Sequence, residues 1–227
     1  MEVGLGNNIA TEPSFSRSHL VKVALWLSWF TIIYNIGEGI VSIYFGIDEA
    51  SIALFGFGMD SFIESFSAIV VLWRFREEAG VTKQTSFKRE QSAASSIGTL
   101  LIALAIITAV SSGLQILEHR PPTSTFPGVV ISLLSLSFMF FLWSKKKQIG
   151  TRLNSTTMLN DAACSLACIK LSVILLVGSL TYMLVPSLWW MDSVAALVMS
   201  FFIAKEGYSM RVAAKSGKIG CSDCGCG

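Results

Sequence analysis

Two carboxylates, Asp60 and Glu64, lie one helical turn apart in residues 51–73, where the other residues are apolar or small. Positions i and i+4 of a helix share one face. The stretch is long enough to cross a hydrocarbon core of about 30 Å, and a charged side chain at that depth costs roughly 2.5–3.5 kcal/mol on insertion scales. The pair therefore indicates a compensating ligand, most simply a bound cation.

A second set of chemically active residues lies at the start of residues 161–184. Asp161, Cys164 and Cys168 are spaced i, i+3 and i+7, which places them on one helix face. Free cysteines often pack as small apolar residues, so the thiols alone are ambiguous. Opposite two carboxylates they favour a metal site, since zinc-like ions take O, N and S ligands. Two cysteines on consecutive helical turns are poorly aimed for a disulfide. We predict one site formed by Asp60, Glu64, Asp161, Cys164 and Cys168.

Other polar residues fall within apolar stretches. Asn35 and Glu38 lie one turn apart in the first stretch, and Glu38 either hydrogen-bonds within the bundle or assists movement of protons or metal. Lys170 is the one cation expected deep in a span, and its simplest partners are Glu38 and Asp192. Asp192 lies near the end of its span, as a helix cap or an exit-side contact. We interpret Asn35, Glu38 and Asp192 as accessory candidates.

The composition is that of a membrane protein. Of the 227 residues, 52% are hydrophobic and 14% are charged, against about 25% charged in a soluble domain, and the mean hydropathy is +0.62. Apolar runs recur along the chain. We therefore expect an all-α membrane protein with six transmembrane helices, at residues 20–45, 51–73, 93–117, 126–143, 161–184 and 188–204.

The positive charges predict the orientation of these helices. With both termini cytoplasmic, every Lys and Arg except Arg120 and Lys170 falls on the inner side or at the inner ends of the spans. The net charge of +2 reflects this bias, so no nucleic-acid partner is expected. The polar start lacks the features of a signal peptide. The predicted organisation is a polar arm at 1–19, a six-helix transmembrane domain at 20–207 and a cytoplasmic tail at 208–227.

Several motifs together resemble one family. The segment 53–64 is similar to a His/Asp-x-x-x-Asp ligand pair with Asp60 and Glu64 in the ligand places, and Cys164 and Cys168 take the place of a second four-spaced pair. The Trp-Asp and Glu-Gly ends of residues 189–207 are also similar. The chain resembles the cation diffusion facilitators, and this resemblance implies six-span, proton-coupled export of divalent metals.

Two departures from that family shape the expected cargo and assembly. Two thiols in the second ligand pair favour softer ions, so we expect zinc or cadmium rather than manganese, with mercury and copper(I) left open. The family's usual cytoplasmic metal-binding domain is missing after the sixth span, so a homodimer would form through the membrane helices. We expect no permanently bound cofactor, and resemblance to compact exporters places the chain in a cell membrane of the bacterial inner-membrane type.

Two other functions remain open at this point. One is a membrane metal sensor or modulatory subunit that moves nothing, and the other is a proton-coupled antiporter of organic cations. An enzyme is not expected, because the sequence offers no nucleophile-and-base set, phosphate loop or redox motif.

The tail carries Cys221, Cys224 and Cys226 within six residues, together with Asp223. In a reducing cytosol this spacing favours thiolate metal capture over disulfides. The alternative is that these cysteines are incidental. We interpret them as an accessory metal site.

Deletion of residues 221–227 tests that interpretation. We expect a lower apparent affinity for the metal with transport retained, because the tail thiols only assist capture. The measurement is the concentration dependence of metal flux into vesicles. Complete loss of flux would show that the tail is essential rather than accessory.

Overall fold

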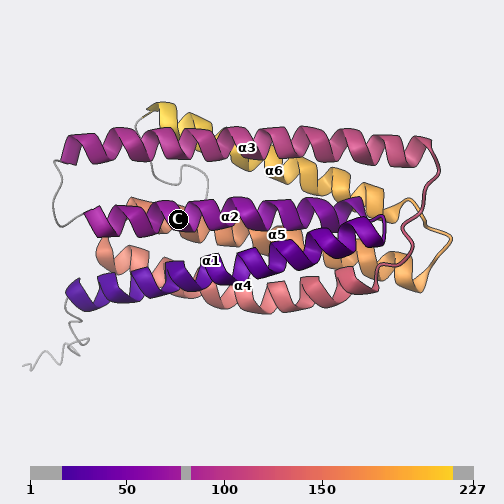
Figure 1. Cartoon of the computed structure of the whole chain (residues 1–227), viewed down its shortest axis with the longest axis horizontal. Coiled ribbons are helices and arrows are strands. Elements are labelled where there is room, and N and C mark those ends of the chain that lie inside the picture. The colour runs from indigo at the N-terminus through magenta and orange to yellow at the C-terminus, as the bar shows by residue number, and fades with distance from the viewer. Residues whose placement is uncertain (1–16, 78–82, 217–227) are drawn as a thin grey trace, which may run out of the picture.

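The computed structural model describes residues 17–77 and 83–216, which form six helices with no strand among them (Figure 1). This architecture confirms the all-α prediction. The helices extend beyond most of the apolar runs. They are α1 (Arg17–Asp48), α2 (Ile52–Glu77), α3 (Lys83–Leu117), α4 (Phe126–Leu153), α5 (Thr156–Leu184) and α6 (Met191–Ser216).

Five of the described helices, α1 to α5, are long and apolar enough to cross a membrane. The sixth is less apolar because it carries Asp192 in its first turn and Lys205 and Glu206 further along. Large apolar side chains cover the outside of the bundle, with Ile33 67% exposed and Ile106 58% exposed. An apolar exterior of this kind is stable in lipid and costly in water. The chain is a multi-pass membrane protein.

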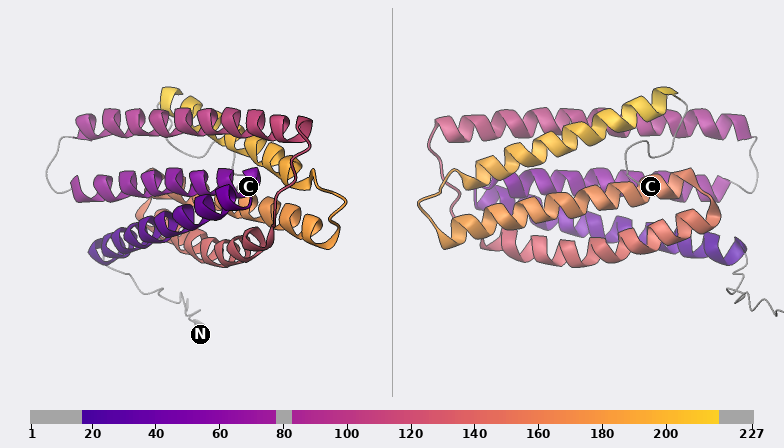
Figure 2. Two further views of the ribbon diagram at one scale, coloured as in Figure 1. Left: turned by 45° about the vertical axis from the view of Figure 1, so that its right-hand side comes forward. Right: turned by 180° about the vertical axis from the view of Figure 1, so that it is seen from behind.

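The helices form two groups. α1, α2, α4 and α5 make a four-helix group through contacts of α1 with α2 and α4, and of α5 with α2 and α4. α3 and α6 pack closely on each other at one side of this group (Figure 1; Figure 2). α2 and α5 have the central places, because each also contacts the α3–α6 pair. The two helices that carry the predicted ligands therefore line the junction of the two groups.

Two glycines allow α3 and α6 to approach closely. A Cβ atom added to Gly98 would lie 2.7 Å from the Gly207 carbonyl oxygen, and one added to Gly207 would lie 2.7 Å from the Gly98 carbonyl oxygen. Both distances are too short for any side chain, so neither position tolerates one without moving the helices. Since Gly207 follows Glu206, this contact also fixes where the Glu206 side chain stands.

Asp192 ties α6 to the start of α2. Its Oδ2 accepts hydrogen bonds from the backbone N–H groups of Ile52 (3.0 Å) and Ala53 (3.4 Å), and its Oδ1 accepts one from the Ser51 hydroxyl (2.6 Å). The Ser51 hydroxyl in turn accepts a bond from the backbone N–H of Leu54 (3.1 Å). Of the two roles considered for Asp192, the structure shows the helix cap. The helix that it caps is the neighbouring α2 and not its own helix, α6. Its buried charge is compensated by N–H donors that the helix itself leaves free.

Replacement of Asp192 by alanine should therefore destabilise the bundle without changing metal binding. The loss of a helix cap typically costs about 1–2 kcal/mol. We expect a lower melting temperature in detergent and an unchanged dissociation constant for cadmium. Asp48→Ala, which removes an exposed carboxylate at the C-terminal end of α1, is the matched control and should leave both quantities unchanged. A large loss of cadmium affinity in Asp192→Ala would instead place this residue on the metal's path.

Candidate metal centre

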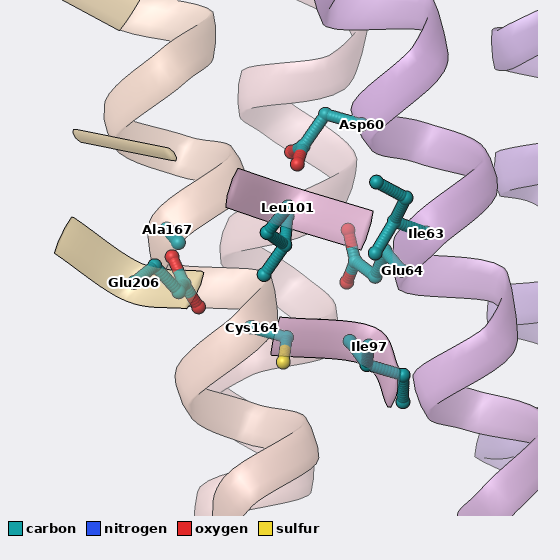
Figure 3. A pocket seen from close by; sticks show the side chains of 8 residues that line it. All are labelled: Asp60, Ile63, Glu64, Ile97, Leu101, Cys164, Ala167 and Glu206. Atoms are coloured by element: carbon teal, nitrogen blue, oxygen red, sulfur yellow. The ribbon is translucent and has the colours of Figure 1, made fainter. Parts of the chain in front are cut away.

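A small cavity lies where α2, α3, α5 and α6 meet, between the two helix groups (Figure 3). Its free volume is about 20 Å³, which by this measure exceeds the roughly 10–15 Å³ that one water molecule needs. Apolar and ligand-type side chains share its wall. The lining residues are Asp60, Ile63 and Glu64 of α2, Ile97 and Leu101 of α3, Cys164 and Ala167 of α5, and Glu206 of α6.

The two carboxylates of α2 differ in how they are held. Asp60 is 8% exposed and Glu64 is 4% exposed, and Figure 3 shows both side chains on the same side of α2. Glu64 Oε1 accepts a 2.6 Å hydrogen bond from the Ser165 hydroxyl. Glu64 Oε2 is buried and has no hydrogen-bond partner. A buried carboxylate oxygen without a donor is costly, and a cation or a proton would compensate this atom.

The α5 residues divide between the cavity and the space behind it. α5 begins at a turn in which Ser155 caps the backbone N–H of Met158. Cys164 reaches the cavity and accepts a hydrogen bond from the Ser67 hydroxyl (3.6 Å). Asp161 is fully buried, and the buried Cys168 thiol lies near Glu64. The structure therefore brings Asp60, Glu64 and Cys164 to one cavity and leaves Asp161 and Cys168 outside its lining.

Glu206 completes the cavity lining from α6, and the sequence analysis did not select it. Its carboxylate lies across the cavity from Glu64 (Figure 3). Asp60, Glu64 and Lys170 are near enough for their charges to act on it. The sequence does contain a signal for Glu206, because this carboxylate directly precedes Gly207. Gly207 is the residue that the close α3–α6 contact requires.

Lys146 is the largest departure from the sequence-based expectation. It was assigned to a charged inner segment after a span ending at residue 143, but α4 continues to Leu153 and the Lys146 side chain is fully buried. Its Nζ lies 3.0 Å from Asp161 Oδ2 and 3.8 Å from Glu64 Oε1. A usable signal was present, because Lys146 shares the helical spacing of the buried Met139, Leu142 and Ile149. Lys170 is thus not the only cation deep in a span.

The expected partners of Lys170 are wrong. Its side chain is exposed, and Asp192 caps α2. Glu38 instead accepts hydrogen bonds from the hydroxyls of Tyr34 (3.0 Å) and Ser61 (2.9 Å), and its accessory role in moving protons or metal stays a prediction. Asn35 is fully buried, and neither polar atom of its side chain has a partner. Neither Glu38 nor Asn35 lines the cavity.

Within residues 17–77 and 83–216, no three His, Cys, Asp or Glu side chains converge on one point as a ready-made metal cluster. Glu64 and Asp161 both lie against Lys146, and Ser165 also holds Glu64. The tail cysteines Cys221, Cys224 and Cys226 lie outside the described residues. A cation that took several of the cavity-lining side chains as ligands would require some of them to rotate.

An apolar helical bundle with carboxylates and a thiol around an internal cavity is a multi-pass membrane protein suited to handling a cation. Residues 24–216 match the family model described as the cation efflux transmembrane domain, and the chain belongs to this family. The family consists of metal cation transporters rather than enzymes. This finding confirms the resemblance stated from the motifs.

A similar protein is transmembrane protein 163 of Xenopus laevis, which is 26% identical over 191 residues. The match covers 83% of this chain and 66% of that protein, so the chain spans about two thirds of the relative's length.

The different places of the two thiols predict different effects on metal preference. The background for the test is the full chain with Cys221, Cys224 and Cys226 changed to serine, here called the tail-serine chain. In it, Cys164→Ser should weaken cadmium binding roughly tenfold or more, because cadmium favours sulfur. The same change should weaken manganese binding little. Cys168→Ser should change both affinities alike, since this residue acts through Glu64. The measurement is equilibrium binding of each ion to purified protein. An equal loss for both ions in Cys164→Ser would remove this thiol from the ligand set.

Proposed function

We propose that this chain is a proton-coupled exporter of zinc- or cadmium-like divalent cations. The observation that carries the proposal is the cavity at the junction of the helix groups, which Asp60, Glu64, Cys164 and Glu206 line together and where one buried oxygen of Glu64 has no hydrogen-bond partner. Buried ionisable groups at this depth of a membrane are expensive unless they serve a cation or proton. Family membership supports the same class of function.

The ligand chemistry favours a borderline or soft ion. Asp60, Glu64 and Glu206 supply oxygens and Cys164 supplies sulfur, which together suit zinc or cadmium in a four-ligand set. Asp161 and Cys168 lie behind this set, where they orient Glu64 and the residues around it. The cavity has room for at least one water-sized particle, and an organic cation would gain little from the sulfur of Cys164.

Transport follows from the position of the cavity between two packed groups of helices. A change in the packing of the α3–α6 pair on the four-helix group would open the cavity to either side in turn. Metal binding requires deprotonated ligands, so protons from the outer side compete with the metal and discharge it there. The protonated site then returns and reloads.

We further propose that α6 is the sixth span and that both termini face the cytoplasm. The charge bias of the connecting segments supports this orientation. In this arrangement Lys145, Lys147 and Arg152 at the end of α4 lie on the cytoplasmic side. The membrane would be a bacterial inner membrane, and 1–19, 20–207 and 208–227 would form the arm, the transport domain and the tail.

Flux measurements in proteoliposomes with an imposed pH gradient test the proposal. The intact chain should move zinc or cadmium in exchange for protons, and Asp60→Ala should abolish this flux in folded protein because the cavity loses a ligand. Glu118→Ala is the matched control, since this carboxylate is exposed and pairs with Arg120, and it should retain flux.

The other outcomes would overturn the proposal. Specific metal binding by the intact chain without flux would identify a sensor or modulatory subunit. Proton-linked flux of an organic cation with no metal flux would identify the antiporter. Proton-dependent metal flux retained in Asp60→Ala would remove the cavity as the transport site.

A further inference from the structure

We propose that Lys146 is a tethered cation that holds Glu64 when the carrier is empty and gives it up when a metal ion binds. This inference rests on the proposed function, because it assigns a regulator to the same cavity. Lys146 would then compete with the metal ion for Glu64 and so lower the affinity of the cavity for the ion.

The contacts of Lys146 place its ammonium on the ligand network. Besides Asp161 Oδ2 at 3.0 Å and Glu64 Oε1 at 3.8 Å, Nζ donates a 2.9 Å hydrogen bond to the Ser165 hydroxyl. That hydroxyl donates to the same Glu64 oxygen at 2.6 Å. One carboxylate oxygen of Glu64 is therefore held on the Lys146 side, while the other remains without a donor.

The two ion pairs of Lys146 are unequal, and this inequality suggests how the exchange proceeds. The shorter contact is to Asp161, which does not line the cavity, and the longer one is to Glu64, which does. When Glu64 turns toward a metal ion, the ammonium keeps Asp161 as its partner. Neither charge is then left alone in the bundle, which avoids the high cost of an unpaired buried ion.

A merely structural ion pair would not need this arrangement. Lys145 and Lys147 on either side are exposed, so α4 has charge available at the surface without burying any. Of these three lysines only Lys146 lies on the buried face of α4, where it contacts Asp161 and the cavity-lining Glu64. Its long unbranched stem also lets the ammonium shift by small rotations.

The variant Lys146→Met tests the inference, because methionine keeps most of the length and removes the charge. In the tail-serine chain we expect the cadmium dissociation constant to fall at least about tenfold, since the metal no longer competes with an ammonium ion. The metal-free protein should melt at a lower temperature, because two buried carboxylates lose their partner, and cadmium should raise its melting temperature more than in the parent. Lys145→Met is the matched control and should match the parent in all three measurements.

A second variant keeps the test decisive if Lys146→Met does not fold. The double variant Lys146→Met with Asp161→Asn loses one charge of each sign and leaves every cavity-lining residue unchanged. It too should bind cadmium more tightly than the parent. Affinity equal to the parent would show a structural role only, and weaker binding would show that Lys146 positions Glu64 for the metal. Absence of specific cadmium binding in the parent would instead refute the proposed function itself.

Discussion

Buried carboxylates in an apolar bundle must each find compensation, and the bundle supplies it in different ways. Asp192 uses the free N–H groups at the start of α2, and Glu38 uses two hydroxyls. Asp161 uses the ammonium of Lys146. One oxygen of Glu64 has a donor and the other has none, and no donor to Asp60 is found among the described residues. Because an unsatisfied polar group is costly in a membrane interior, the proposed function assigns a cation or a proton to these two cavity-lining carboxylates.

The cavity lies between the two helix groups, so a shift of one group against the other would change its shape. The cavity is not enclosed within the four-helix group but lies against the α3–α6 pair, which contributes both its apolar wall and Glu206. The close contact of Gly98 with Gly207 makes this pair a single packing unit. In the proposed transport cycle, movement of this pair against its neighbours would shift Glu206 relative to the other cavity-lining residues without unfolding any helix. The proposal thus links cargo binding to the relative placement of the two helix groups.

The sequence predicted the helices well and the site in part. Long apolar runs determine helices in lipid, because the backbone must satisfy its own hydrogen bonds there, and the i, i+4 spacing correctly put Asp60 and Glu64 on one side of α2. Lys146 and Glu206 were missed for one reason, which is that sequence patterns do not show which charged residues turn inward. Lys146 stands in a lysine triplet typical of a surface, and its burial depends on the carboxylates of α2 and α5. The depth of Cys164 relative to Cys168 likewise depends on how α5 is rotated against α2.

In the proposed function, one divalent cation binds in the cavity through carboxylates and a single thiolate. X-ray absorption spectroscopy of cadmium bound to the tail-serine chain tests this ligand set, because the method distinguishes sulfur from oxygen neighbours of the ion. We expect one sulfur neighbour, lost in Cys164→Ser and kept in Cys168→Ser, with oxygen atoms completing the shell. A shell with no sulfur, or a sulfur signal that survives in Cys164→Ser, would show that Cys164 is not a ligand of the ion.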